Sequence, residues 1–210
     1  KVNQDNTMGA IIALNCETDF VAKNDNFVEL AHELAEQAVM YANKEEFLAS
    51  DFHGMTVAEK LIEQTGVIGE KIEIGAFERI EGPFLGAYIH AGNKIAAISS
   101  LSANVDGASE VAKSVSMQVA AMKPIALDET MVSQETVDKE LEIERELLTK
   151  EGKPANIIDN ILKGKMQKFY KDNTLVHQSF IKDANMSVAD YVKSIDSDLK
   201  VVGFVRASLT

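Results

Sequence analysis

An internal repeat constrains the fold of this chain more than any other feature of its sequence. The segment "ELAHELAEQAVM", which begins at Glu29, reappears in outline as "EVAKSVSMQVAA", which begins at Glu110. Apolar positions of the first copy fall on apolar positions of the second: Leu30 on Val111, Leu34 on Val115 and Ala38 on Val119. Similarity at a constant spacing is typical of a duplicated structural unit.

A second pair of matching segments extends the repeat. "MTVAEKL" at Met55 is echoed by "MSVADYV" at Met186, and each is preceded by an apolar element that contains Phe47 or Phe180. Each half therefore reads as a strand, a loop, a long helix, a short capped helix and a strand. We predict an α+β fold built from two similar α/β subdomains.

Two helix starts in the first copy carry capping signals. Apolar residues recur at helical spacing from Phe27 to Ala42, and Asn26 is predicted to cap this helix with Glu29 three positions further on. Thr56 and Glu59 repeat the same signature at the start of the next helix. Both signals support the helical part of the repeated unit.

Only the second copy carries an insertion, which lies between Ser133 and Asp172. Two helical stretches meet there at "EGKPAN", where Gly152 suits a helix end and Pro154 the first turn of the next helix. The apolar stripe is narrow and the charge content is high, so we predict a projecting antiparallel coiled-coil hairpin. The predicted subdomains are residues 1–82, residues 83–132 with 173–210, and the coiled-coil insertion 133–172.

The first copy alone has an aromatic residue between its opening strand and its long helix. "LNCETDFVAKND" places Phe20 beside Asp19 in a polar loop, whereas the second copy makes the same connection as "SLSANVDGAS". One interpretation is that Phe20 fills the core, because large apolar residues are usually buried. The other is an exposed anchor of a protein interface. The repeat favours the anchor, because the scaffold does without a phenylalanine in its other half.

Charge and composition exclude several classes of partner. The net charge of −12 opposes sequence-independent binding to nucleic acid phosphates, so we expect no direct nucleic-acid partner. The longest apolar run, "AIIAL", is too short to cross a bilayer, and we expect a soluble protein with no membrane partner. A single cysteine fits a reducing compartment. We therefore expect a cytoplasmic location, or an organellar matrix in a eukaryote. Lys1 stands in place of an initiating methionine, which is consistent with a fragment of a longer protein.

The sequence carries no motif of covalent or metal chemistry. It has no glycine-rich phosphate loop, no CxxC, no HExxH and no GxSxG, and its four histidines lack ligand spacing. We therefore expect no enzyme, no cofactor, no metal and no catalytic residue. Two alternatives remain open: a thiol enzyme centred on Cys16 with His90, and a non-catalytic adaptor or scaffold protein that binds through its acidic coiled coil.

One segment resembles a known family. "NCETDFVAKNDNF" is similar to the signature of elongation factor Ts, the guanine nucleotide exchange factor of the translation factor EF-Tu. "VIGEKIEI", "YIHAGNKIA", "EGKPANII" and "GFVR" match further landmarks of that family in order, over nearly the whole chain. The resemblance implies a core of two similar subdomains with a protruding coiled coil.

The resemblance also implies a partner and its contacts. EF-Tu would be the partner. The resemblance leaves open whether the protein forms a homodimer or a heterotetramer with EF-Tu. Thr18, Asp19, Phe20 and Val21 would intrude beside the magnesium and phosphate site of EF-Tu and promote the release of GDP. Further contacts with the GTPase domain would come from Ile68, Gly69 and His90.

Overall fold

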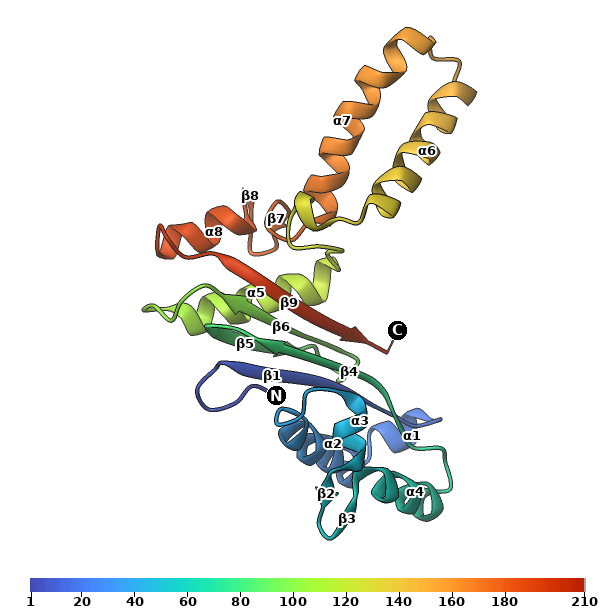
Figure 1. Cartoon of the computed structure of the whole chain (residues 1–210), viewed down its shortest axis with the longest axis vertical. Coiled ribbons are helices and arrows are strands. Elements are labelled where there is room, and N and C mark those ends of the chain that lie inside the picture. Colours follow the sequence, from blue (N-terminus) through green and yellow to red (C-terminus); the bar gives the residue numbers. More distant parts are fainter. Residues whose placement is uncertain (210) are drawn as a thin grey trace. The chain divides into compact units, whose positions relative to one another are not determined.

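The computed structural model describes residues 1–209 and is a mixture of helices and strands, which confirms the α+β class (Figure 1). The chain divides into two compact units. One contains residues 1–120 and the chain from Val202 onward, and the other contains residues 121–201. None of the helices formed by residues 1–209 is long and apolar enough to span a bilayer.

The first unit is built on two antiparallel sheets. In one, β1 (Met8–Asn15) pairs with β4 (Glu73–Glu81). In the other, the strands β5 (Phe84–Ile89), β6 (Ile95–Leu101) and β9 (Val201–Ser208) follow the order β5-β6-β9. Ile11 of β1 packs in one cluster with Leu85 and Ile98, so the two sheets meet face to face.

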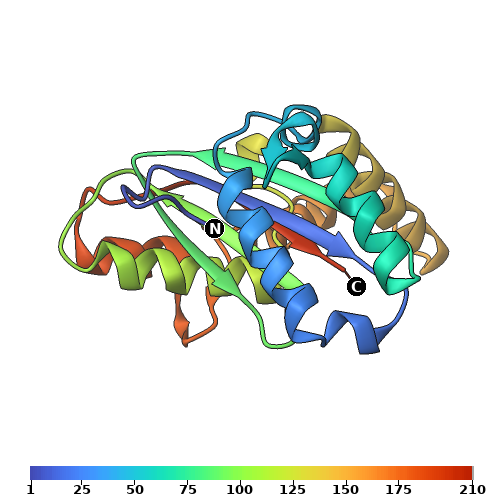
Figure 2. The same cartoon turned by 90° about the horizontal axis from the view of Figure 1, so that it is seen from below.

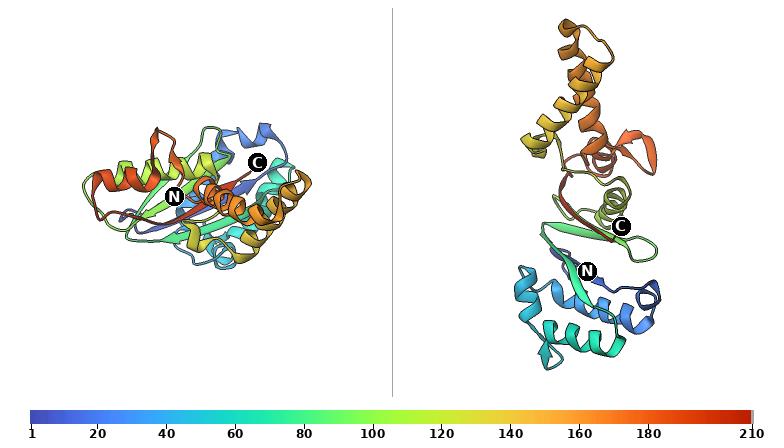
Figure 3. Two further views of the ribbon diagram at one scale, coloured as in Figure 1. Left: turned by 90° about the horizontal axis from the view of Figure 1, so that it is seen from above. Right: turned by 90° about the vertical axis from the view of Figure 1, so that its right-hand side faces the viewer.

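Helices cover the other face of β1. They are α1 (Asp19–Ala22), α2 (Asp25–Ala38), α3 (Lys44–Ala49) and α4 (Val57–Ile68), with the short hairpin β2 (Asp51–Phe52) and β3 (Met55–Thr56). Because successive strand residues face opposite sides, Ala10 and Leu14 point toward these helices while Ile11 points away. Figures 1 and 3 show α2, α3 and α4 on the side of β1 opposite β5, β6 and β9.

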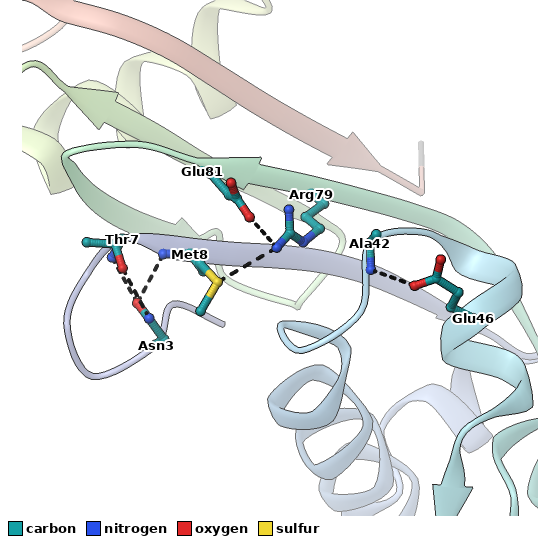
Figure 4. Close-up of polar contacts among 7 residues, drawn as sticks. All are labelled: Asn3, Thr7, Met8, Ala42, Glu46, Arg79 and Glu81. Carbon is teal, nitrogen blue, oxygen red and sulfur yellow. Dashed lines mark hydrogen bonds and ion pairs between the residues drawn. The ribbon is translucent and has the colours of Figure 1, made fainter.

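Polar contacts fix the edges of this sheet (Figure 4). The Asn3 side chain accepts hydrogen bonds from the backbone N–H groups of Thr7 (2.8 Å) and Met8 (3.1 Å), which closes the turn before β1. In β4, Arg79 pairs with Glu81 and also contacts the sulfur of Met8. The turn and the sheet edge are thereby tied together.

Helix α5 (Ala108–Met122) packs against β5 and β6. The Ser116 hydroxyl donates to the Gly86 carbonyl oxygen (2.7 Å), and the Ser99 hydroxyl donates to the Ala112 carbonyl oxygen (2.8 Å). A Cβ at Gly86 would lie 2.4 Å from the Ala112 side chain, so this close approach requires glycine.

Of the two helix caps predicted from the sequence, one is confirmed and one is wrong. The capping box of Thr56 and Glu59 is confirmed at α4. The predicted cap of α2 is wrong, since Asn24 rather than Asn26 caps it and the helix ends at Ala38. The reason is that the Asn24 side chain accepts from the backbone N–H of Asn26 (3.0 Å), which places Asn26 inside the first turn.

The second unit contains a pair of long helices and a small hairpin with a helix. Its elements are the 3₁₀ turn η1 (Glu129–Met131), α6 (Gln134–Lys150), α7 (Ala155–Asn173), β7 (Ser179–Phe180), β8 (Asp183–Ser187) and α8 (Val188–Ile195). Helices α6 and α7 run side by side in opposite directions (Figures 1 and 3). Leu148, Ile158 and Leu162 form the apolar cluster that joins them.

The turn between α6 and α7 agrees in part with its sequence signals. Gly152 has φ 75° and follows Glu151, the C-cap of α6, as predicted for a helix end. Pro154 is the residue that caps α7 rather than a residue of its first turn, because its ψ of 138° is extended. The ion pair between Arg145 and Asp159 (2.8 Å) links the two helices beside this turn.

Candidate functional site

Phe20 is the most exposed of the large hydrophobic side chains in residues 1–209, with 84% of its surface accessible. The predicted polar loop is a single helical turn, α1, and Phe20 is its second residue. Large apolar side chains are usually buried, and this one is not, which excludes the interpretation of Phe20 as a core residue.

Neighbouring side chains orient this turn. Thr18 caps α1, and its hydroxyl oxygen accepts a hydrogen bond from the backbone N–H of Val21 (3.4 Å). Val21 packs against the core cluster of the first unit. Asp19 forms an ion pair with Lys23 one turn along (2.6 Å). With Val21 directed inward, Phe20 is directed toward solvent.

Glu70 connects the α1 turn to the end of α4. Its carboxylate accepts hydrogen bonds from the backbone N–H groups of Glu17 and Thr18, both 2.9 Å, and from the Thr18 hydroxyl. These bonds, led by that of the hydroxyl, hold the pKa of the Glu70 carboxyl below its usual range. In Figures 1 and 2 the α1 turn lies beside the end of α4.

Ile68 and Gly69 are therefore brought close to Thr18 through their neighbour Glu70. Ile68 is the last residue of α4 and packs against the core cluster. Gly69 caps this helix with φ 78° and ψ 11°, a left-handed conformation that favours glycine. A Cβ at Gly69 would meet no atom within 4 Å, so its conformation and not crowding calls for glycine.

His90 lies at the tip of the β5–β6 hairpin and is exposed. Its backbone N–H donates to the Ile95 carbonyl oxygen (2.8 Å), and its ring Nδ1 lies 3.1 Å from the Tyr88 hydroxyl. Gly92 and Asn93 have φ 87° and 56°, values that suit the turn between these strands.

The hairpin and the α1 turn are neighbours. The pKa of the Asp19 carboxyl is lowered chiefly by its hydrogen bond and ion pair with Lys23, and also by the charge of Lys94 in the hairpin. A cavity of about 190 Å³ is bordered by Ala22 at the end of α1 and by Gly92, Asn93 and Lys94. The remaining walls of this cavity come from Lys1, β1, α2, β5, β6 and the end of β9.

The surroundings of Cys16 do not favour a nucleophilic thiolate. Burial raises the pKa of its thiol, and the nearby negative charge of Glu70 raises it further. The thiol donates a weak hydrogen bond to the Thr18 carbonyl oxygen (3.3 Å). A raised pKa keeps the sulfur protonated near neutral pH, whereas a thiolate is the reactive form. In the described residues, no group of three or more His, Cys, Asp or Glu side chains is arranged to hold a metal ion.

Sequence reasoning missed Glu70. It singled out Ile68 and Gly69 in "VIGEKIEI" but gave no role to the carboxylate that follows them. Glu70 and Thr18 are 52 positions apart, and a single sequence carries no signal that pairs them. An acidic residue directly after a helix-ending glycine was the only local hint.

Comparison with known proteins places the chain among similar sequences. The family model described as elongation factor TS matches residues 17–210. The elongation factor Ts of Christiangramia forsetii is 62% identical over 209 residues, which cover 100% of this chain and 76% of that protein. The elongation factor Ts of Flavobacterium psychrophilum is 61% identical over 208 residues, covering 99% and 76% of the two chains. For Porphyromonas gingivalis the identity is 43% over 203 residues, covering 95% and 73%.

Proposed function

The chain belongs to the elongation factor Ts family, the guanine nucleotide exchange factors of EF-Tu, and on that premise we propose that the α1 turn is what it inserts into its partner. The observation that carries this proposal is the exposure of Phe20, 84%, on a turn fixed by Thr18, Val21 and Glu70. Exposed aromatic side chains held on rigid segments are typical anchors of protein interfaces.

An exchange factor needs no covalent step. It binds the nucleotide-free partner more tightly than the nucleotide-bound partner, and by linkage the nucleotide then binds the complex more weakly. Loosening a nucleotide a thousandfold requires about 4 kcal/mol of differential binding. Burial of one phenylalanine contributes roughly 1.5 to 3 kcal/mol. Phe20 alone is therefore too weak, and a second region of contact is required.

We place that second region at Ile68, Gly69 and His90. Ile68 and Gly69 adjoin Glu70, which is bonded to the α1 turn, and the hairpin that carries His90 borders the same cavity as Ala22. Contacts on two sides of α1 would hold Phe20 against the nucleotide site of EF-Tu. Each contact adds to the differential affinity only where the nucleotide-bound partner cannot make it.

Asp19 supplies charge in this proposal. In the free protein its carboxylate is paired with Lys23 (2.6 Å) and is well exposed. Beside the nucleotide site of EF-Tu it would present a negative charge to the groups that otherwise hold magnesium and phosphate. The negative charge of Asp19 would repel the nearby phosphate groups of the nucleotide, which would weaken the binding of the nucleotide to EF-Tu.

The two-subdomain organisation and the coiled-coil insertion form part of the same proposal, with the bounds 1–82, 83–132 with 173–210, and 133–172. Local similarity supports the repeat. The hairpin β2–β3 leads into α4 through a capping box of Thr56 and Glu59, and the hairpin β7–β8 leads into α8 through one of Ser187 and Asp190. The complex with EF-Tu would act in the cytoplasm.

Release of fluorescent GDP from EF-Tu tests the proposal. An exchange factor accelerates release when present at a small fraction of the EF-Tu concentration, because each molecule acts repeatedly. An adaptor that only binds EF-Tu through its acidic helices leaves the release rate unchanged at every ratio. The second result, obtained with folded protein that binds EF-Tu, would refute the proposed function.

A further inference from the structure

We propose that Glu70 is a positioning residue for nucleotide exchange, because its carboxylate holds the α1 turn in the orientation that presents Phe20. This inference rests on the proposed function of Phe20. It adds a residue that has no predicted contact with the partner, and it assigns to that residue a task inside the free protein.

The turn cannot hold its own shape. Helix α1 has four residues, and a helix of one turn is unstable in water without outside contacts. The structure supplies those contacts on one side through Val21, which packs on the core, and on the other through Glu70. Loss of either contact leaves the turn attached at one side only.

The hydrogen bonds of Glu70 form a relay. The carboxylate accepts from the Thr18 hydroxyl, and the oxygen of the same hydroxyl accepts from the backbone N–H of Val21 (3.4 Å). The Thr18 and Glu17 backbone N–H groups reach the carboxylate directly, each at 2.9 Å. Glu70 therefore acts on the residues before and after Phe20 at once. Hydrogen bonds to a charged acceptor are shorter and stronger than bonds between neutral groups.

A second carboxylate makes the connection reciprocal. The Glu17 side chain accepts from the backbone N–H of Lys71 (3.3 Å), next to Glu70. Hydrogen bonds in both directions thus join residues 17–18 to residues 70–71. An anchor that is already held in its binding conformation loses less conformational entropy on binding, which favours the bound state.

Glu70 adds little to the core. Its side chain is only partly buried and lies outside the apolar core cluster, and it accepts hydrogen bonds from Glu17 and Thr18, the two residues before α1. Glu73, on the same segment, provides a matched control because its carboxylate pairs with Lys71 (2.8 Å) and makes no contact with the turn. Removal of Glu70 should therefore loosen the turn and leave the fold intact.

The hydrogen bonds from Glu17 and Thr18 to Glu70 are called the clamp below. Amide hydrogen exchange of the free protein tests this clamp in the absence of EF-Tu. In Glu70→Ala we expect the backbone amides of Glu17 and Thr18 to exchange at least about tenfold faster, since exchange reports local opening. Glu70→Gln, which keeps an acceptor oxygen, should lie between Glu70→Ala and wild type, and Glu73→Gln should match wild type. Unchanged protection in Glu70→Ala, at an unchanged melting temperature, would overturn the clamp.

A double-mutant cycle on GDP release tests whether the clamp acts through Phe20. We expect Glu70→Ala to slow release by about tenfold in the wild-type background and by less than about twofold in the Phe20→Ala background, because coupled residues are not additive. Equal factors in the two backgrounds would overturn the positioning role. If Phe20→Ala alone leaves release unchanged, the proposed function fails, whereas the amide exchange still decides whether Glu70 holds the turn.

Discussion

The hydroxyl of Thr18 donates a hydrogen bond to the carboxylate of Glu70 across 52 positions of sequence. This bond joins the helical turn that carries Phe20 to the segment that carries Ile68 and Gly69. Two stretches that sequence reasoning named separately thereby form one surface.

Truncation of two phenylalanines should have very different effects on stability. Phe180 is 3% exposed and stacks on Tyr191 with ring centroids 4.0 Å apart, so Phe180→Ala should lower the free energy of unfolding by about 3 to 5 kcal/mol. Phe20→Ala should leave it nearly unchanged, because the side chain makes few contacts to lose. Denaturant unfolding followed by circular dichroism measures both values. Equal losses in the two variants would place Phe20 in the core.

Removal of the long helices should spare the rest of the protein. Replacement of residues 135–171 by a short Gly/Ser linker deletes the cluster of Leu148, Ile158 and Leu162, which is separate from the core of the first unit. It keeps Asn173, whose carbonyl oxygen accepts from the Ile125 backbone N–H (2.9 Å). We expect a cooperative melting transition close to that of the intact chain. A much lower melting temperature would show that these helices support the whole fold.

The α1 turn should loosen in acid. The pKa of Glu70 is lowered by its hydrogen bonds, so its contribution is present above the ordinary carboxyl pKa and is lost as the pH falls through its own lower pKa. The Thr18 amide resonance should therefore titrate with Glu70 in NMR spectra. Cys16, Glu17 and Lys71 are the other titratable groups around this carboxylate, and Glu70→Gln removes the titration of Glu70 alone. A Thr18 amide that titrates equally in Glu70→Gln would contradict the assignment.

The chain alone should bind neither GDP nor magnesium with useful affinity. Its sequence has no phosphate-binding loop, and no described group of acidic or histidine side chains is arranged as a metal site. Isothermal titration calorimetry of the free chain should record no binding heat for either ligand. Micromolar binding of GDP would require a nucleotide site of the chain's own, which the exchange mechanism does not use.

Local signals were predictable from the sequence, and contacts between distant segments were not. The capping box of Thr56 and Glu59 depends on neighbours in sequence, and it is confirmed. The cap of α2 was placed wrongly because Asn26 has Glu29 three positions further on, whereas the true cap, Asn24, has Phe27 there and lacks that signal. The exposure of Phe20 was favoured by the comparison of the two copies.

Neither the α1 turn nor its hydrogen bonds to Glu70 could be predicted from the sequence. A helix of four residues is too short to show a repeating apolar pattern, so the sequence predicted a loop at Asp19–Ala22. The role of Glu70 depends on the fold that brings α4 beside Thr18, and acidic residues are so common on this chain that none stands out. The missed features are those that only tertiary contacts define.

GDP release from EF-Tu in the presence of Phe20→Ala tests the central claim most directly. Met40→Ala is the matched control, because Met40 is also highly exposed, at 72%, but lies after the end of α2 and away from the α1 turn. Loss of roughly 1.5 to 3 kcal/mol of intruding contact corresponds to release slowed by about 10- to 100-fold. We predict that slowing for Phe20→Ala at saturating concentration, with Met40→Ala at the wild-type rate. Wild-type release by folded Phe20→Ala would contradict the account.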